Sequence, residues 1–124
     1  MNEKEIYEQW IENYLVPQMA NDASKIPDLF ADEGVYWYGP YFEPRKGVDA
    51  IFEHHRNALS HQKNIKYTWK ILASNDEFAL AWFDLTLEAL AENEPNAYQG
   101  IFKITLDEHG ACTLFEEWYN FTNT

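Results

Sequence analysis

Apolar residues in the first half of the chain recur at helical spacing. Over residues 3–20 the positions i, i+3, i+4, i+7 and i+8 are occupied by Tyr7, Trp10, Ile11, Tyr14 and Leu15. This stripe predicts an amphipathic helix from Glu3 to Ala20. Pro17 lies late in the pattern and removes one backbone donor, so we expect a kink or an early end there. A second stripe after Gly47 predicts another helix and contains Val48, Ile51, Phe52, His55 and Leu59.

Two short elements are expected between these helices. Ser24 precedes Ile26–Phe30 and is a suitable N-cap for a short helix. Residues Val35–Tyr38 predict a strand that ends at Gly39 and Pro40.

The second half of the chain changes to strand patterns. Residues Ile65–Ala73, Phe78–Leu90, Tyr98–Leu106 and Thr113–Phe121 predict four strands that are separated by turn-forming residues. Successive hairpins of this kind form an antiparallel meander. Helices in the first half and strands in the second predict an α+β fold, in which a curved antiparallel sheet packs on three helices as one domain over residues 1–124.

Composition narrows the possible partners and location. The net charge of −12 repels phosphate backbones and anionic membranes, which argues against nucleic-acid and membrane binding. Hydrophobic residues make up 46% of the chain, yet no apolar run is long enough to span a bilayer and no secretory signal is evident. The single cysteine, Cys112, excludes an intrachain disulfide and reads as a small buried hydrophobe. We therefore expect a cytoplasmic protein.

Several motifs resemble those of a known superfamily. The run from Leu29 to Tyr36 leads to Glu43-Pro44-Arg45-Lys46-Gly47, and this stretch is similar to one in bacterial ketosteroid isomerases. The ending from Gly100 to Trp118 resembles the last hairpin of many SnoaL-like proteins. The order of elements over nearly the whole chain is also that of the nuclear transport factor 2-like superfamily. The resemblance implies a cone-shaped fold with an internal pocket, in a superfamily that contains isomerases, cyclases, epoxide hydrolases, dehydratases and binding domains.

The resemblance to the isomerases does not extend to their catalytic residues. Their oxyanion-binding tyrosine matches Tyr14, but the aspartate that moves the proton falls on Tyr38. Their buried aspartic acid falls on or near Phe102. A phenol is a poor base at neutral pH and a phenyl ring donates no proton. Steroid isomerisation by that mechanism is therefore not expected.

The resemblance also implies which side chains face inward. On strand 113–121 it directs Phe115, Glu117 and Tyr119 inward, and on strand 35–38 Tyr36 and Tyr38. A carboxyl desolvated among aromatic rings has a raised pKa, so Glu117 is the first candidate for a general acid or base. The alternative is an outward, solvated side chain like that of Glu116.

Further catalytic and ligand-binding residues are proposed around Glu117. Asp84 interrupts an apolar strand and would be a second carboxyl in the pocket, with Trp82 on the same strand face. Alternatively, Asp84 faces water while Phe83, Leu85 and Leu87 form the core. Tyr14 and Tyr38 can polarise a ligand oxygen, or serve as core tyrosines. His55 can shuttle a proton, although a lone histidine on an apolar helix face is more often a packed core residue. The residues predicted to contact ligand are Tyr38, Tyr36, Trp82, Phe102, Phe115 and Tyr119.

These observations lead to one functional hypothesis and two alternatives. No phosphate-binding loop, dinucleotide motif or metal motif is present, so no cofactor and no metal is expected. The hypothesis is an enzyme without cofactor that isomerises, cyclises or dehydrates a small apolar carbonyl or hydroxyl compound. The alternatives are a non-catalytic binding domain and an interaction module whose cavity is filled. Surplus aromatic residues on the outer sheet face predict a homodimer.

Overall fold

Three helices form as the apolar stripes predict. The computed structural model describes residues 1–123, and in it α1 spans Glu3–Met19, α2 spans Ile26–Leu29 and α3 spans Val48–Leu59. Asn2 caps α1, because its side chain accepts a hydrogen bond from the Glu5 amide at 2.9 Å. The helix continues past Pro17 for two residues. The predicted cap at Ser24 is wrong, since Lys25 precedes α2 and makes no side-chain capping bond.

Six strands form one sheet. They are β1 (Phe30–Trp37), β2 (Arg45–Lys46), β3 (Gln62–Ser74), β4 (Ala79–Ala89), β5 (Ala97–Leu106) and β6 (Cys112–Thr122). Their spatial order is β2-β1-β6-β5-β4-β3. All neighbouring pairs are antiparallel except β1 and β6, which are parallel. The predicted α+β class is confirmed, and the parallel pair and the short β2 add to the predicted meander.

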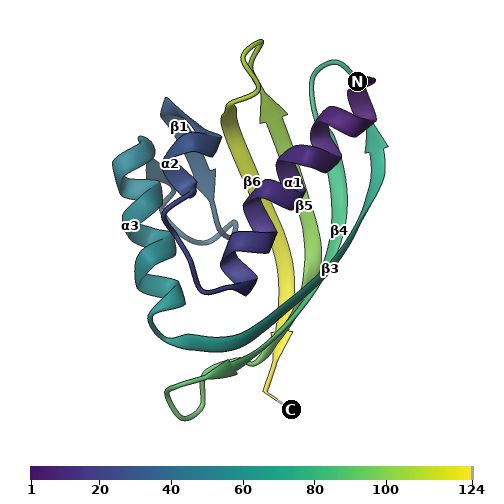
Figure 1. The fold of residues 1–124 in the computed structure, drawn as a ribbon. Helices are drawn as coiled ribbons and strands as arrows, with labels where there is room; N and C mark the ends of the chain where they lie inside the picture. Colours follow the sequence, from purple (N-terminus) through teal and green to yellow (C-terminus); the bar gives the residue numbers. More distant parts are fainter. Residues whose placement is uncertain (124) are drawn as a thin grey trace.

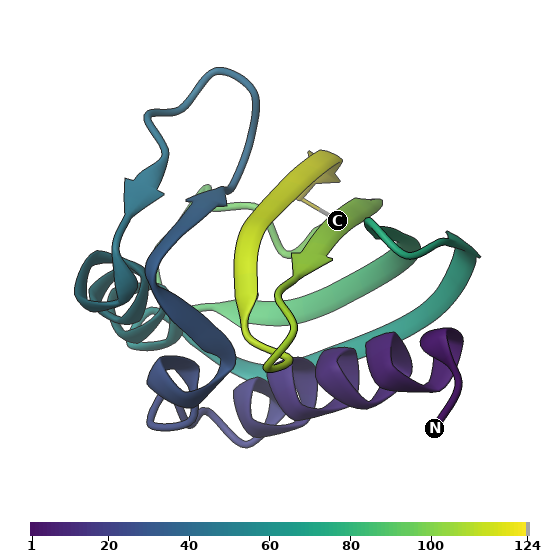
Figure 2. The ribbon, with the colours of Figure 1, turned by 90° about the horizontal axis from the view of Figure 1, so that it is seen from above.

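All three helices lie on one face of the sheet. Figures 1 and 2 show α1 running across the concave side of the curved strands, with α3 beside β1. The opposite face carries no helix (Figure 2). Within the described residues, no helix is long and apolar enough to cross a membrane.

Strand register decides which side chains face the helices. On β4 the buried residues are Ala81, Phe83 and Leu85, and Phe83 stacks on Phe102 of β5 with ring centroids 4.1 Å apart. Alternate side chains of a strand point to opposite faces, so Trp82 and Asp84 belong to the outer face. Cys112 lies in the core, as predicted, and burial raises the pKa of its thiol to about 12.

Candidate functional site

A cavity of about 180 Å³ lies between the concave face of the sheet and the helices α1 and α3. Its wall contains many phenols, two imidazoles and one carboxyl. The lining residues are Tyr14, Gln18, Tyr36, Tyr38, His54, His55, Ala58, Leu59, Gln62, Tyr67, Leu85, Tyr98, Glu117 and Tyr119. They come from both long helices and from five strands, so the cavity exists only in the folded chain.

Glu117 supplies the only carboxyl among these lining residues. It lies opposite Phe102 on the neighbouring strand β5. Burial raises the pKa of the Glu117 carboxyl from an ordinary 4.5 to about 8, and a hydrogen bond from Tyr36 opposes this rise. The Tyr36 hydroxyl lies 3.3 Å from Glu117 Oε1. The carboxyl is therefore mostly protonated at pH 7.

Tyr14 and His55 form a buried pair beside this carboxyl. The Tyr14 hydroxyl lies 2.7 Å from His55 Nε2, and His55 Nδ1 lies 2.8 Å from the carbonyl oxygen of Ile51. A carbonyl oxygen only accepts, so Nδ1 carries the proton and Nε2 accepts one from Tyr14. Burial lowers the pKa of His55 to about 4, which keeps the ring neutral at physiological pH.

The Tyr14 and Tyr36 hydroxyls bring these two pairs next to each other. Burial raises the pKa of Tyr14, and a hydrogen bond with the Tyr36 hydroxyl opposes that rise. When Glu117 is protonated, its hydroxyl can donate to Tyr36, Tyr36 to Tyr14, and Tyr14 to His55. This series of hydrogen bonds ends where the Nδ1–H group of His55 donates to the Ile51 carbonyl oxygen. A bond donated by Tyr36 favours the carboxylate, so burial is what keeps Glu117 neutral, while the two phenols link its carboxyl to the buried histidine.

The stack of rings at the end of β1 forms another part of the cavity wall. Tyr38 stacks on Phe42 and also contacts His54, with ring centroids 4.8 Å and 4.3 Å away. The Arg45 guanidinium lies over the Tyr38 ring, 5.4 Å from its centroid. Burial and the nearby Arg45 lower the pKa of His54 to about 4, so this imidazole is also neutral.

The structure brings together six of the ten residues that the sequence analysis proposed. Those lining the cavity are Glu117, Tyr14, His55, Tyr36, Tyr38 and Tyr119. The predicted placement of Asp84 and Trp82 in the pocket is wrong, because Phe83 and Leu85 occupy the inner face of β4. Asp84 instead lines a shallow outer groove with Gln99 and Asn120.

Phe102 and Phe115 also do not line the cavity. Their exposed fractions are 1% and 0%, so neither ring offers surface to a ligand. They pack beneath Tyr14, with ring centroids 6.3 Å and 5.1 Å from its own. Both residues are therefore part of the hydrophobic support under the site.

Five polar lining residues are additional to those proposed: Gln18, His54, Gln62, Tyr67 and Tyr98. Tyr67 could have been predicted to line the cavity, because it alternates with Ile65 and Trp69 on the inner face of a predicted strand. Tyr98 alternates in the same way with Phe102 and Ile104 on the predicted strand 98–106, whereas His54 carries no such signal. Their positions depend on the hairpin register of β5 and on the way α3 packs against β1.

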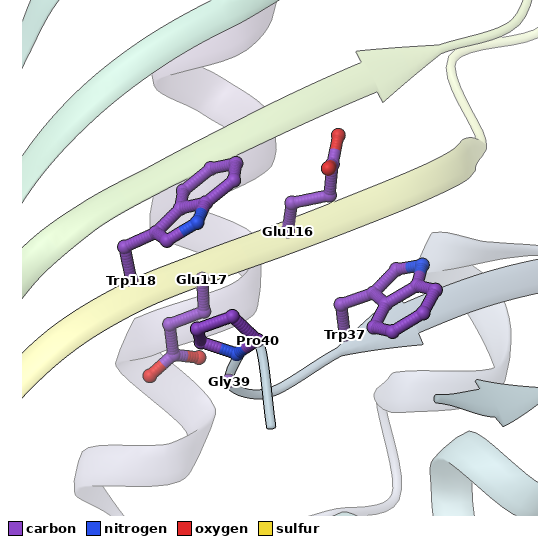
Figure 3. Close-up of a pocket in the computed structure, with 6 residues that line it drawn as sticks. All are labelled: Trp37, Gly39, Pro40, Glu116, Glu117 and Trp118. Carbon is purple, nitrogen blue, oxygen red and sulfur yellow. The ribbon is translucent and has the colours of Figure 1, made fainter. Parts of the chain in front are cut away.

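The outer side of β6 carries different side chains from the side that faces the cavity. Figure 3 shows Glu116 and Trp118 on one side of the strand and Glu117 on the other, beside Gly39 and Pro40. The groove beside them has a volume of about 210 Å³, and Trp37 of β1 and Glu117 also line it, so Glu117 borders both this groove and the cavity. Glu116 lies 3.8 Å from Lys103, whereas Glu117 has no basic partner among the described residues. The carboxyls of Glu116 and Glu117 therefore lie in different environments, although the two residues are adjacent in the chain.

Comparison with solved structures identifies the architecture. A candidate isomerase from Bacillus subtilis superposes with a TM-score of 0.83 at 17% identity, covering 97% of this chain and 90% of that protein. A steroid delta-isomerase from Pseudomonas aeruginosa gives a TM-score of 0.69 at 17% identity over 93% of this chain and 80% of the other. This chain has the nuclear transport factor 2-like fold.

Other proteins with the nuclear transport factor 2-like fold carry different chemistry. SalBIII, an epoxide hydrolase/cyclase-like enzyme in pyran ring formation, has a TM-score of 0.76 at 14% identity, with coverage of 94% and 89% of the two chains. No family model matches the chain. No curated protein matches it either. Similarity at these identities establishes the fold and leaves the activity to be argued from the site.

Within residues 1–123, no three His, Cys, Asp or Glu side chains come close enough together to hold a metal ion.

Proposed function

We propose that this protein is an enzyme in which Glu117 acts as a general acid on a small molecule bound in the cavity. The observation that carries this proposal is a carboxyl inside a phenol-lined cavity, hydrogen-bonded to Tyr36 and without a basic partner among the described residues. A catalytic acid is most effective when its pKa lies near the working pH. The pKa of Glu117, raised by burial to about 8, meets that condition.

The proposed reaction transfers the Glu117 proton to an oxygen of the substrate. The carboxyl O–H bond breaks as the substrate's C–O bond opens, and the resulting carboxylate then takes a proton from the attacking hydroxyl or from an adjacent carbon. Ring closure, ring opening and dehydration all follow this sequence. The epoxide hydrolase/cyclase-like neighbour supports this reaction class. The Tyr36 hydroxyl positions the acid.

The role of Tyr14 differs from that of a simple oxyanion donor. Its proton is already directed at His55 Nε2, 2.7 Å away, so it is not free for a ligand in this state. This observation also favours a second candidate function, in which the cavity binds a ligand without transforming it.

A substrate panel with a matched pair of variants tests the proposal. The panel contains an epoxy alcohol able to close to a six-membered ring and a β-hydroxy ketone, with products followed by mass spectrometry. We expect Glu117→Gln to lower kcat about 100-fold or more, the usual contribution of a general acid. Glu116→Gln, on the outer face, should stay within about 2-fold of wild type.

The pH profile provides a second readout. A general acid must be protonated, so kcat should fall as pH rises through about 8, the pKa of Glu117. Equal rates for wild type and Glu117→Gln would refute the acid role. If no panel compound reacts although one binds in the cavity, the binding function is supported instead.

A further inference from the structure

Several hydroxyl groups of the cavity make no hydrogen bond within the described part of the chain. Six tyrosines line it, and the hydroxyls of four of them make no hydrogen bond to any residue in the described part of the chain. These four are Tyr38, Tyr67, Tyr98 and Tyr119. Tyr67 and Tyr119 are partly buried, and burial raises the pKa of both phenols, so each remains a neutral donor.

The same wall lacks fixed charge. Among the described lining residues there is no Lys, Arg or Asp, and the one carboxyl is Glu117. His54 and His55 are neutral for the reasons given above. An ionic ligand in such a site would lose its hydration without gaining a counter-ion, which costs several kcal/mol. A neutral ligand with oxygen atoms would instead accept hydrogen bonds from the four hydroxyls.

The volume limits the size of the ligand. A cavity of about 150 Å³ holds a benzene molecule, and the cavity here measures about 180 Å³. The space therefore fits one six-membered ring with one or two small substituents. A molecule with several fused rings would exceed it.

We propose that the ligand of this cavity is an uncharged, oxygen-bearing molecule of about one six-membered ring, held through the free hydroxyls of Tyr38, Tyr67, Tyr98 and Tyr119. This inference rests on the proposed function in that it concerns the same cavity, but it requires no turnover. It refines the apolar carbonyl or hydroxyl compound that the sequence suggested, because the rings that line the wall present hydroxyls as well as hydrocarbon edges.

Four probes of matched size test this inference: a cyclohexanediol, toluene, cyclohexylammonium and cyclohexanecarboxylate. Their dissociation constants are measured by NMR titration of the labelled protein at pH 7. We expect the diol to bind at least 10-fold more tightly than either ion. The variants Tyr98→Phe and Tyr119→Phe should each weaken diol binding about 2- to 10-fold, the range of one hydrogen bond, and leave toluene unchanged.

Controls separate this inference from the proposed chemistry. Tyr41→Phe alters a side chain that is 99% exposed and should not affect any probe. The preference for the diol should persist in Glu117→Gln, which removes the acid but adds no charge. Tighter binding of an ion or of toluene than of the diol overturns the inference, as does the failure of all four probes to bind the folded protein. Loss of activity in Glu117→Gln with an unchanged binding order supports both proposals.

Discussion

Glu117 should make folding stability depend on pH in a direction opposite to that of most carboxyls. Burial raises its pKa from 4.5 to about 8, so the folded protein holds this proton over a range in which the unfolded chain has released it. The free energy of unfolding therefore falls as pH rises from about 4.5 to about 8. A rise of this size corresponds to on the order of 5 kcal/mol over the full range, or about 1.4 kcal/mol for each pH unit.

Urea unfolding at pH 5.5, 6.5 and 7.5, followed by tryptophan fluorescence, measures this dependence. In Glu117→Gln the side chain cannot ionise, so the slope that Glu117 contributes should disappear and the stability curve should be flatter than that of wild type. Glu116→Gln lies on the outer face of the same strand and should keep the wild-type slope. The carbon NMR signal of the Glu117 carboxyl provides a direct check, with a midpoint expected near pH 8. A midpoint near 4.5, or parallel stability curves for wild type and Glu117→Gln, would show that the carboxyl is solvated.

Two further predictions concern the buried pair and the outer face. Tyr14→Phe leaves the buried Nε2 of His55 without its 2.7 Å donor, so we expect the free energy of unfolding in urea to fall by about 1–3 kcal/mol. The exposed control Tyr41→Phe should lose about 0.5 kcal/mol or less. An equal loss in both variants would contradict the assigned bond. We also propose that the outer sheet face joins two copies of the chain, since Trp82 and Trp118 flank one residue of β5 in register there. Sedimentation should show a dimer for wild type and a monomer for Trp82→Glu, and a wild-type monomer at all concentrations would refute this interface.

Local patterns in the sequence predicted most of the elements and part of the site. The stripe from Val48 to Leu59 predicted α3 and its start after Gly47, because apolar spacing directly reflects the buried face of a helix. Glu117 was placed inward through the resemblance to related folds, and the structure agrees. The two-residue strand β2 is too short to produce any periodic pattern.

The predictions that were wrong or missing depend on packing between distant segments, which a local sequence pattern does not contain. On β4 both alternating sets include apolar residues, Trp82 in one and Phe83 in the other, so the pattern alone does not say which set faces the helices. The stacking of Phe83 on Phe102 decides it. The bond between Tyr14 and His55 joins residues 41 positions apart, and its geometry depends on how two helices pack.

The parallel pairing of β1 with β6 has a consequence for the order of events during folding. Tyr36 and Glu117, which this pairing brings together, are 81 positions apart in the chain. Closing so long a segment of chain costs more conformational entropy than closing a hairpin, so we expect this contact to form after the hairpins. The helices and the hairpins of β3, β4 and β5 can assemble from nearby segments, whereas the acid meets its phenol only after β6 has docked between β5 and β1. A nascent chain that has not yet been synthesised as far as β6 therefore lacks the strand that carries Glu117.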